Sequence, residues 1–243
     1  MNLDSSNEMG FLDHLEELRW RLVRGLLAII FCSGLSFGFI DDILLILLHP
    51  SKVTNNNIVL QSLHVQSMFI IKWFIAFVSG FIISLPYLVY QFWQFIAPGL
   101  KVNEKKFALP FVFFSSISFV FGVLFGYFIL VPYSLEFFSG MADVHVKNNF
   151  SIQYYFSFLT WLLVGCGIIF QLPVVSFILS AIGVLTPAFM KHYRKHSLIA
   201  ILILSSFITP PDPISMLIMS LPLVLLYEIS IGISWFFSKI KPN

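Results

Sequence analysis

Long apolar stretches separated by short polar segments dominate the pattern of this 243-residue chain. A helix needs about 20 mainly apolar residues to cross the hydrocarbon core of a bilayer. We therefore expect an all-α integral membrane protein with six transmembrane helices in a single transmembrane domain, residues 1–243. The pattern predicts these spans at approximately 20–40, 73–96, 108–132, 153–183, 196–209 and 214–237.

The last apolar region is interrupted by the segment Thr209-Pro-Pro-Asp-Pro213. Proline has no backbone N–H to donate, so this segment must end a helix. The two arms around it predict a short hairpin made of the fifth and sixth helices. The first arm, 196–208, is roughly 20 Å long at 1.5 Å per residue, which is little for a spanning helix. Asp212 is placed to cap the helix that follows.

The cations predict the orientation of the spans. With the N-terminus inside, eleven Lys and Arg residues fall on the cytoplasmic side and three on the opposite side. Cytoplasmic segments of membrane proteins carry such an excess, so both termini are expected inside. Charged residues make up only 11% of the chain and the net charge is +2. This composition excludes a disordered chain and a nucleic-acid-binding protein.

The N-terminal segment, residues 1–19, is predicted to be a cytoplasmic amphipathic helix that lies on the inner interface and leads into the first span. Its leucines at positions 12, 15, 18 and 22 form an apolar stripe at helical spacing. Asp13 and Glu16 have the spacing of a capping box. The first 18 residues contain no Lys or Arg, which argues against a cleavable signal peptide. The segment from Asp41 to Met68 is expected to be a loop.

Few strongly polar groups fall inside the spans, where they are costly unless paired or hydrated. Gln171 lies two residues before Pro173, within a region predicted to be one long helix from Gln153 to Gly183. Its amide either bonds locally to the carbonyl that the proline frees or lines a cavity; the pattern leaves both open. Glu228, in the sixth span, has no second acid at a similar depth. Cys32 and Cys166 lie in apolar runs and are expected to be buried thiols rather than a disulfide.

Catalysis is not predicted. The chain has no H-E-x-x-H, G-x-S-x-G or phosphate-binding glycine loop. His192 and His196 are four residues apart, but they lie among Lys191, Arg194 and Lys195, so a headgroup-facing segment is favoured over a metal site. We expect no catalytic residue, metal or cofactor. A small-solute transporter would need several polar groups near the midplane, and only Gln171 and Glu228 qualify.

Seven segments, taken in order, resemble TatC, the multispanning receptor subunit of the twin-arginine protein translocase. The segments are His14-Leu-Glu-Glu-Leu-Arg19, Pro86-Tyr-Leu-Val-Tyr-Gln91, Phe95-Ile-Ala-Pro-Gly-Leu100 with Glu104-Lys-Lys106, Phe170-Gln-Leu-Pro173, Gly183-Val-Leu-Thr-Pro187, Phe207-Ile-Thr-Pro-Pro-Asp212 and Leu226-Tyr-Glu-Ile229. Each motif alone is weak evidence, but the order of all seven along nearly the whole chain is specific.

The resemblance implies a concave helical scaffold and a receptor that binds twin-arginine signal peptides of folded proteins at the cytoplasmic face. Carried over by motif, Glu17 and Glu104 become the carboxylates for the two guanidinium groups. Phe95 lies close to Glu104 in sequence, and Arg19 belongs to the same motif as Glu17. A carboxylate accepts a planar guanidinium bidentately, which lysine cannot reproduce.

The resemblance also implies single-span partners of the TatA and TatB type near the hairpin, a homo-oligomer within the complex and no nucleic acid. Gln171, Thr209, Asp212 and Glu228 are the candidate cavity or partner contacts. Two positions depart from the family's pattern, since many relatives have Glu at Gln171 and a polar residue at Met216. The expected location is the bacterial inner membrane, with a plastid or mitochondrial membrane as the alternative.

Overall fold

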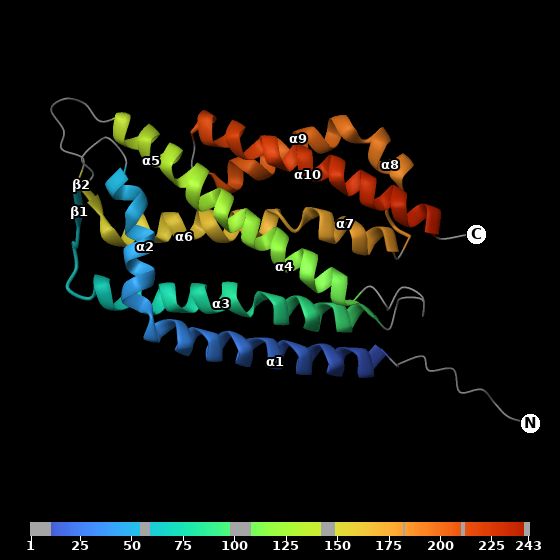
Figure 1. Ribbon diagram of the computed structural model, residues 1–243, viewed down its shortest axis with the longest axis horizontal. Helices are drawn as coiled ribbons and strands as arrows, with labels where there is room; N and C mark the ends of the chain where they lie inside the picture. Colours follow the sequence, from blue (N-terminus) through green and yellow to red (C-terminus); the bar gives the residue numbers. More distant parts are fainter. Residues whose placement is uncertain are drawn as a thin grey trace, which may run out of the picture.

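The computed structural model describes residues 11–53, 59–97, 108–141, 149–181, 183–209 and 212–240. Helices account for most of them (Figure 1). Five helical stretches are long and apolar enough to cross a membrane. The elements are α1 (Phe11–Gly38), α2 (Ile40–Val53), β1 (Val59–Gln61), α3 (Ser67–Ile96), α4 (Ala108–Phe125), a π-helical turn (Gly126–Leu130), α5 (Val131–Gly140), β2 (Asn149–Ser151), α6 (Ile152–Ile169), α7 (Leu172–Ala181), α8 (Pro187–His192), α9 (Arg194–Ile208) and α10 (Pro213–Ile240).

The long helices run roughly along one axis, with α1 beside α3 on one side and the α9–α10 hairpin on the other (Figure 1). α6 and α7 lie between them, and α4 with α5 crosses this layer at an angle. The start of α1 and the end of α10 lie at the same end of the bundle. The two strands lie at the opposite end, where they pair in parallel with Leu60 opposite Phe150.

The N-terminal segment is not a separate element, because α1 runs without a break from Phe11 to Gly38. The predicted capping box is wrong, since Asp13 lies inside the first turn rather than before it. The contact between α1 and α3 is close where Gly80 meets Ser33. A Cβ added at Gly80 would lie 2.2 Å from the Ser33 Oγ, so only glycine allows this approach.

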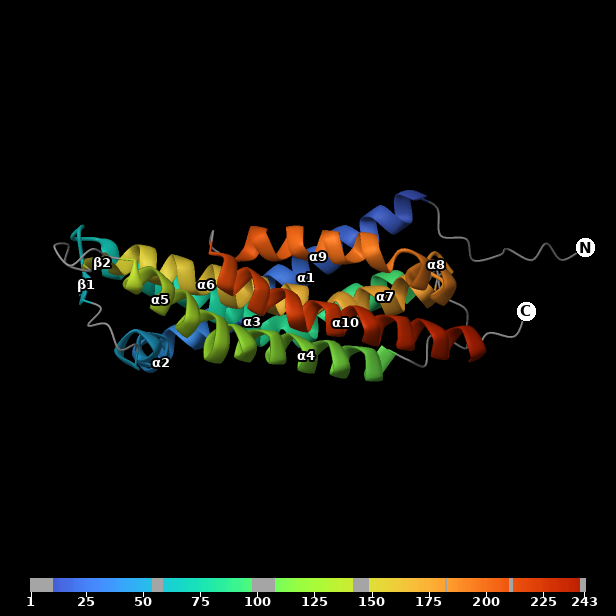
Figure 2. The ribbon, with the colours of Figure 1, turned by 90° about the horizontal axis from the view of Figure 1, so that it is seen from above.

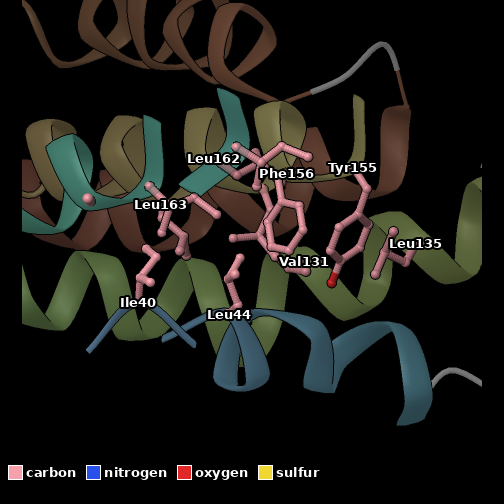
Figure 3. Close-up of a cluster of buried hydrophobic side chains, with 12 residues drawn as sticks. Ile40, Leu44, Val131, Leu135, Tyr155, Phe156, Leu162 and Leu163 are labelled. Carbon is pink, nitrogen blue, oxygen red and sulfur yellow. The ribbon is translucent and has the colours of Figure 1, made fainter. Parts of the chain in front are cut away.

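The loop predicted from Asp41 is wrong over its first part, which forms α2. Figure 3 shows Ile40 and Leu44 of α2 pointing toward Val131, Leu135 and Tyr155 of α5 and α6. The Tyr155 hydroxyl also donates to the carbonyl of Leu47 at 2.7 Å. With 14 residues this helix is too short to be found in a search for membrane spans. Its burial against two distant helices stabilises it.

The fourth apolar region is two helices rather than one. α6 ends at Ile169 and α7 begins at Leu172. The reason is Pro173, which cannot donate to the carbonyl four residues earlier. The third region extends beyond its predicted end at 132, because α4 continues through the π-helical turn into α5 as far as Gly140.

The predicted helix break at the prolines is confirmed, since α9 ends at Ile208 and α10 begins at Pro213. α9 has 15 residues, roughly 22 Å. The sixth helix is not short, because α10 has 28 residues. In both ribbon views the tip of the hairpin stops before the end of the bundle that carries the strands (Figures 1 and 2).

Candidate functional site

A polar cluster joins α1 to α3 near the start of α1. Glu17 and Arg21 lie one turn apart on α1, and the Glu17 Oε1 accepts hydrogen bonds from the Arg21 Nε at 2.9 Å and from its Nη2. The Arg21 side chain is only 14% exposed and that of Glu17 22%. Such burial makes this ion pair more than the loose surface contact that an i, i+4 pair usually provides.

Arg21 is also held from α3. Its Nη1 donates to the Gln94 Oε1 at 2.6 Å and to the Gln91 Oε1 at 3.2 Å. The Gln94 amide in turn donates to the Tyr90 hydroxyl. All three nitrogens of the guanidinium therefore have acceptors, and its plane is fixed between the two helices.

Phe95 belongs to the same cluster through His14. The two rings are stacked, with centroids 4.2 Å apart and an interplanar angle of 10°. The His14 Nδ1 lies 3.8 Å from the Glu17 Oε2, beyond hydrogen-bond range. The Glu17 Oε2 is buried and has no hydrogen-bond partner among the residues that the structure describes. The Oε1 of this carboxylate therefore accepts two hydrogen bonds, whereas the Oε2 accepts none from the described residues.

Arg19, another predicted signal-binding residue, stands apart from this cluster. The Arg19 guanidinium lies over the ring of Trp20, 5.7 Å from its centroid. Glu104 lies outside the described residues, so its proximity to Glu17 stays a prediction. The structure thus brings together Glu17 and Phe95 and leaves Arg19 on another face of α1.

Gln171 lies at the junction of α6 and α7 and pairs across to α4. The Ser115 Oγ donates to its Oε1 at 2.5 Å, and its Nε2 donates to the Ser115 carbonyl at 3.0 Å. The sequence left two interpretations of Gln171 open. The first, in which its amide bonds locally to the carbonyl freed by Pro173, is wrong. The side chain reaches a neighbouring helix instead.

Glu228 has a partner that the sequence analysis did not assign. The Arg194 Nη2 at the start of α9 donates to the Glu228 Oε2 on α10 at 2.6 Å, and both side chains are about half exposed. The pair ties the two arms of the hairpin together. A charge in an otherwise apolar helix is satisfied here by a cation from the adjacent arm.

Polar residues at the hairpin tip are buried and bond locally, except that the Asp212 Oδ1 is buried with no hydrogen-bond partner among the described residues. The Thr209 Oγ1 donates to the Ser205 carbonyl at 2.8 Å. The Asp212 Oδ2 accepts from the Ser215 N–H at 2.7 Å, which confirms the predicted cap. Ser215 in turn shares a 2.8 Å hydrogen bond with Ser134 of α5. This hydrogen bond holds the tip of the hairpin against α5.

Sequence reasoning missed His14, Gln91 and Gln94 as members of the α1–α3 cluster. The signal was present, because Gln91 and Gln94 are three residues apart at the polar end of an apolar helix and therefore share a face. It also missed Ser115 as the partner of Gln171. A single serine in an apolar helix gives no sign of which neighbouring helix it faces.

The helices and this polar cluster define a multi-pass membrane protein with a carboxylate-bearing site where two helices meet. The family model for "Sec-independent protein translocase protein (TatC)" matches residues 13–222. The chain belongs to the TatC family and is a component of a protein translocase.

Similar proteins cover nearly the whole chain. TatC of Halalkalibacterium halodurans is 34% identical over 231 residues, which is 95% of this chain and 90% of that protein. TatC of Helicobacter pylori is 37% identical over 222 residues, 91% of this chain and 87% of that protein. A crystal structure of "Twin Arginine Translocase Receptor- TatC" matches with a TM-score of 0.78 and 35% identity, covering 92% of this chain and 98% of that one.

Proposed function

We propose that this protein binds twin-arginine signal peptides of folded proteins at the cytoplasmic face, as the receptor and core component of a twin-arginine translocase. The similar crystal structures carry the name twin arginine translocase receptor. Within this chain, the observation that carries the proposal is the buried Glu17 Oε2, which has no hydrogen-bond partner among the described residues. An unpaired carboxylate oxygen is costly to bury and is stabilised by an incoming guanidinium.

Phe95 supports the same proposal. The His14 ring stacks on Phe95, and its Nδ1 lies 3.8 Å from the Glu17 Oε2, so His14 connects the aromatic ring to the carboxylate. A guanidinium stacks on an aromatic face while it donates in its own plane to a carboxylate. Glu104 is the proposed second carboxylate, and Arg19 is proposed to contact the backbone or acidic groups of the signal. The function requires binding and release of a peptide and involves no reaction or cofactor.

Crosslinking tests the site. Glu17→Ala and Glu104→Ala should each weaken photo-crosslinking of the full chain in membranes to a peptide with an arginine-pair signal. Arg24→Ala, an exposed α1 residue, is the matched control and should leave capture unchanged. Unchanged capture by the Glu17→Ala/Glu104→Ala double variant, with normal membrane insertion, would overturn the assignment.

The proposed arrangement has six spans in a single membrane domain, with both termini in the cytoplasm and a concave scaffold. The excess of Lys and Arg in the segments assigned to the cytoplasmic side supports this orientation. Ile214, beside the hairpin tip, is 51% exposed. In a variant without native cysteines, Ile214→Cys should react with an impermeant thiol reagent from the outer side only. Labelling from the cytoplasm would exclude this topology.

The proposed location is the bacterial inner membrane, and the proposed partners are TatA- and TatB-type single-span proteins that pack near the hairpin. Gln171, Thr209, Asp212 and Glu228 are proposed to act there. Thr209 and Asp212 are 4% and 1% exposed, so they would shape the tip rather than supply much contact area. Exposed Phe207 and Leu221 offer apolar area.

Purification in mild detergent tests the partners and the proposed homo-oligomer. Small single-span proteins should co-purify with the wild type, and Phe207→Asn/Leu221→Asn should reduce their recovery. Crosslinking of two differently tagged copies should report the homo-oligomer. Recovery of the chain alone, as a monomer, would contradict this part of the proposal.

A further inference from the structure

The two oxygens of the Glu17 carboxylate are held unequally. The Oε1 accepts two hydrogen bonds from Arg21, whose guanidinium is also fixed by the Gln94 Oε1 at 2.6 Å. The Oε2 has no such bond among the described residues, and the His14 Nδ1 lies 3.8 Å from it. The Oε2 is therefore buried without a hydrogen bond, although the imidazole of His14 lies close to it.

The His14 imidazole lies beside the Glu17 Oε2 and resembles the guanidinium of an arginine in shape. Its ring is planar, can carry a positive charge and lies flat on Phe95, with centroids 4.2 Å apart. A guanidinium has the same three properties: it is planar, charged and stacks on aromatic faces. In addition it has five N–H donors, so it can bond to the Oε2 where the imidazole does not reach.

We propose that His14 is a resident competitor for one arginine of the signal peptide and lowers the affinity of the site for that arginine. This inference rests on the proposed function. The incoming guanidinium displaces the His14 ring from Phe95 and donates to the Glu17 Oε2, while Arg21 keeps the Oε1. His14 lowers the arginine affinity in this way, because part of the binding free energy is used to displace its ring from Phe95.

The contacts explain why His14 is the group that leaves. Its side chain is 40% exposed, whereas that of Arg21 is 14% exposed. His14 lies in the first turn of α1, which begins at Phe11. Helix ends fray, so the ring can move away without breaking the α1–α3 contact. Arg21 would have to give up acceptors on both helices.

Arginine and lysine should differ in whether they displace the His14 ring. A lysine ammonium is a compact point charge that neither stacks flat nor forms a fork, so it does not replace the contacts that His14 makes. Removing the His14 ring should therefore strengthen binding of the arginine pair more than that of a lysine pair. The gain should be about 3- to 10-fold for the arginine pair, since one exposed stack and one weak charge contact are lost.

The experiment measures the dissociation constant of a fluorescent signal peptide for the full chain in detergent, by anisotropy. The peptide carries either an arginine pair or a lysine pair. The variants are His14→Ala, His14→Phe and Glu17→Gln, with His64→Ala as the matched histidine control, since His64 is exposed and lies before α3 rather than on α1. His14→Phe keeps a ring that can stack on Phe95. Thermal unfolding confirms that each variant is folded.

The expected result is tighter arginine-pair binding by His14→Ala only, with a smaller gain for the lysine pair. His14→Phe should stay within about twofold of the wild type because the stack persists. If Glu17→Gln weakens binding but His14→Ala does not strengthen it, or strengthens both peptides equally, the competitor role is wrong and the proposed function stands. If Glu17→Gln leaves arginine-pair binding unchanged, the proposed function itself fails.

Discussion

Ser115 and Gln171 hydrogen-bond to each other twice, by the Ser115 hydroxyl at 2.5 Å and by the Ser115 carbonyl at 3.0 Å. The contact joins α4 to the junction between α6 and α7. It places a neutral amide between apolar helices. The amide donates and accepts at once, so both its oxygen and its nitrogen are satisfied between the two helices.

Removing the Gln171 amide should therefore destabilise the protein. Gln171→Leu should lower the free energy of unfolding by about 1–3 kcal/mol, because the Ser115 hydroxyl loses its acceptor in an apolar surrounding. Thermal unfolding in detergent measures the effect. Ser220→Ala is the control, since its hydroxyl is exposed and bonds within its own turn to Leu217. A loss for Gln171→Leu no larger than for the control would contradict this role.

Asp212 should act as a helix cap through one oxygen. Asp212→Ala should cost about 0.5–2 kcal/mol, while Asp212→Asn should cost less, because an amide oxygen can still accept from the Ser215 N–H. The same unfolding assay compares the two. Equal losses for alanine and asparagine would show that the charge, and not the cap, is what the tip requires.

The Arg194–Glu228 pair should couple the two arms of the hairpin only weakly. Both side chains are 49% exposed, so a double-mutant cycle with Arg194→Gln and Glu228→Gln should give a coupling of about 0.2–1 kcal/mol. Lys195→Gln in place of Arg194→Gln provides the matched cycle and should give none. A coupling above about 3 kcal/mol would mean that the pair is shielded from solvent far more than its exposed area indicates.

Arg21 should orient Glu17 for the signal. Arg21→Lys keeps the charge but cannot reach the acceptors on both helices, so the Glu17 carboxylate loses its fixed plane. Arginine-pair peptide affinity should fall about 3- to 10-fold, or roughly 1 kcal/mol. Arg24→Lys, an exchange at an exposed position of the same helix, should leave it unchanged. Tighter binding by Arg21→Lys would show that Arg21 competes with the signal instead.

The helix break at the hairpin tip could be predicted, because several prolines in a short segment act locally. The segment before Pro213 separates α9 from α10 as expected. The break before Pro173 was missed because one proline inside an apolar run is compatible with either a kink or a break. α2 was missed for a different reason: it has only 14 residues, and its helical state depends on burial against α5 and α6.

The sequence could predict which kinds of residue form the candidate site, but not how those residues lie relative to one another. The i, i+4 spacing of Glu17 and Arg21 places the two side chains on one face of a helix, within reach of each other. That Phe95 would meet His14, and Gln94 would meet Arg21, depends on how α1 packs along α3. A sequence pattern gives the face of each helix but not the register between two of them. The unequal use of the two Glu17 oxygens depends on the side-chain conformations of Arg21 and His14 on α1, which a sequence pattern does not give.

The central claim is that the Glu17 carboxylate pairs with an arginine of the signal peptide. A double-mutant cycle tests it most directly, with Glu17→Gln in the full chain and each signal arginine changed in turn to lysine, read as peptide dissociation constants. For one of the two arginines we expect a coupling of at least about 1 kcal/mol, because the second change costs little once the pair is broken. Strictly additive losses at both arginines would contradict the account.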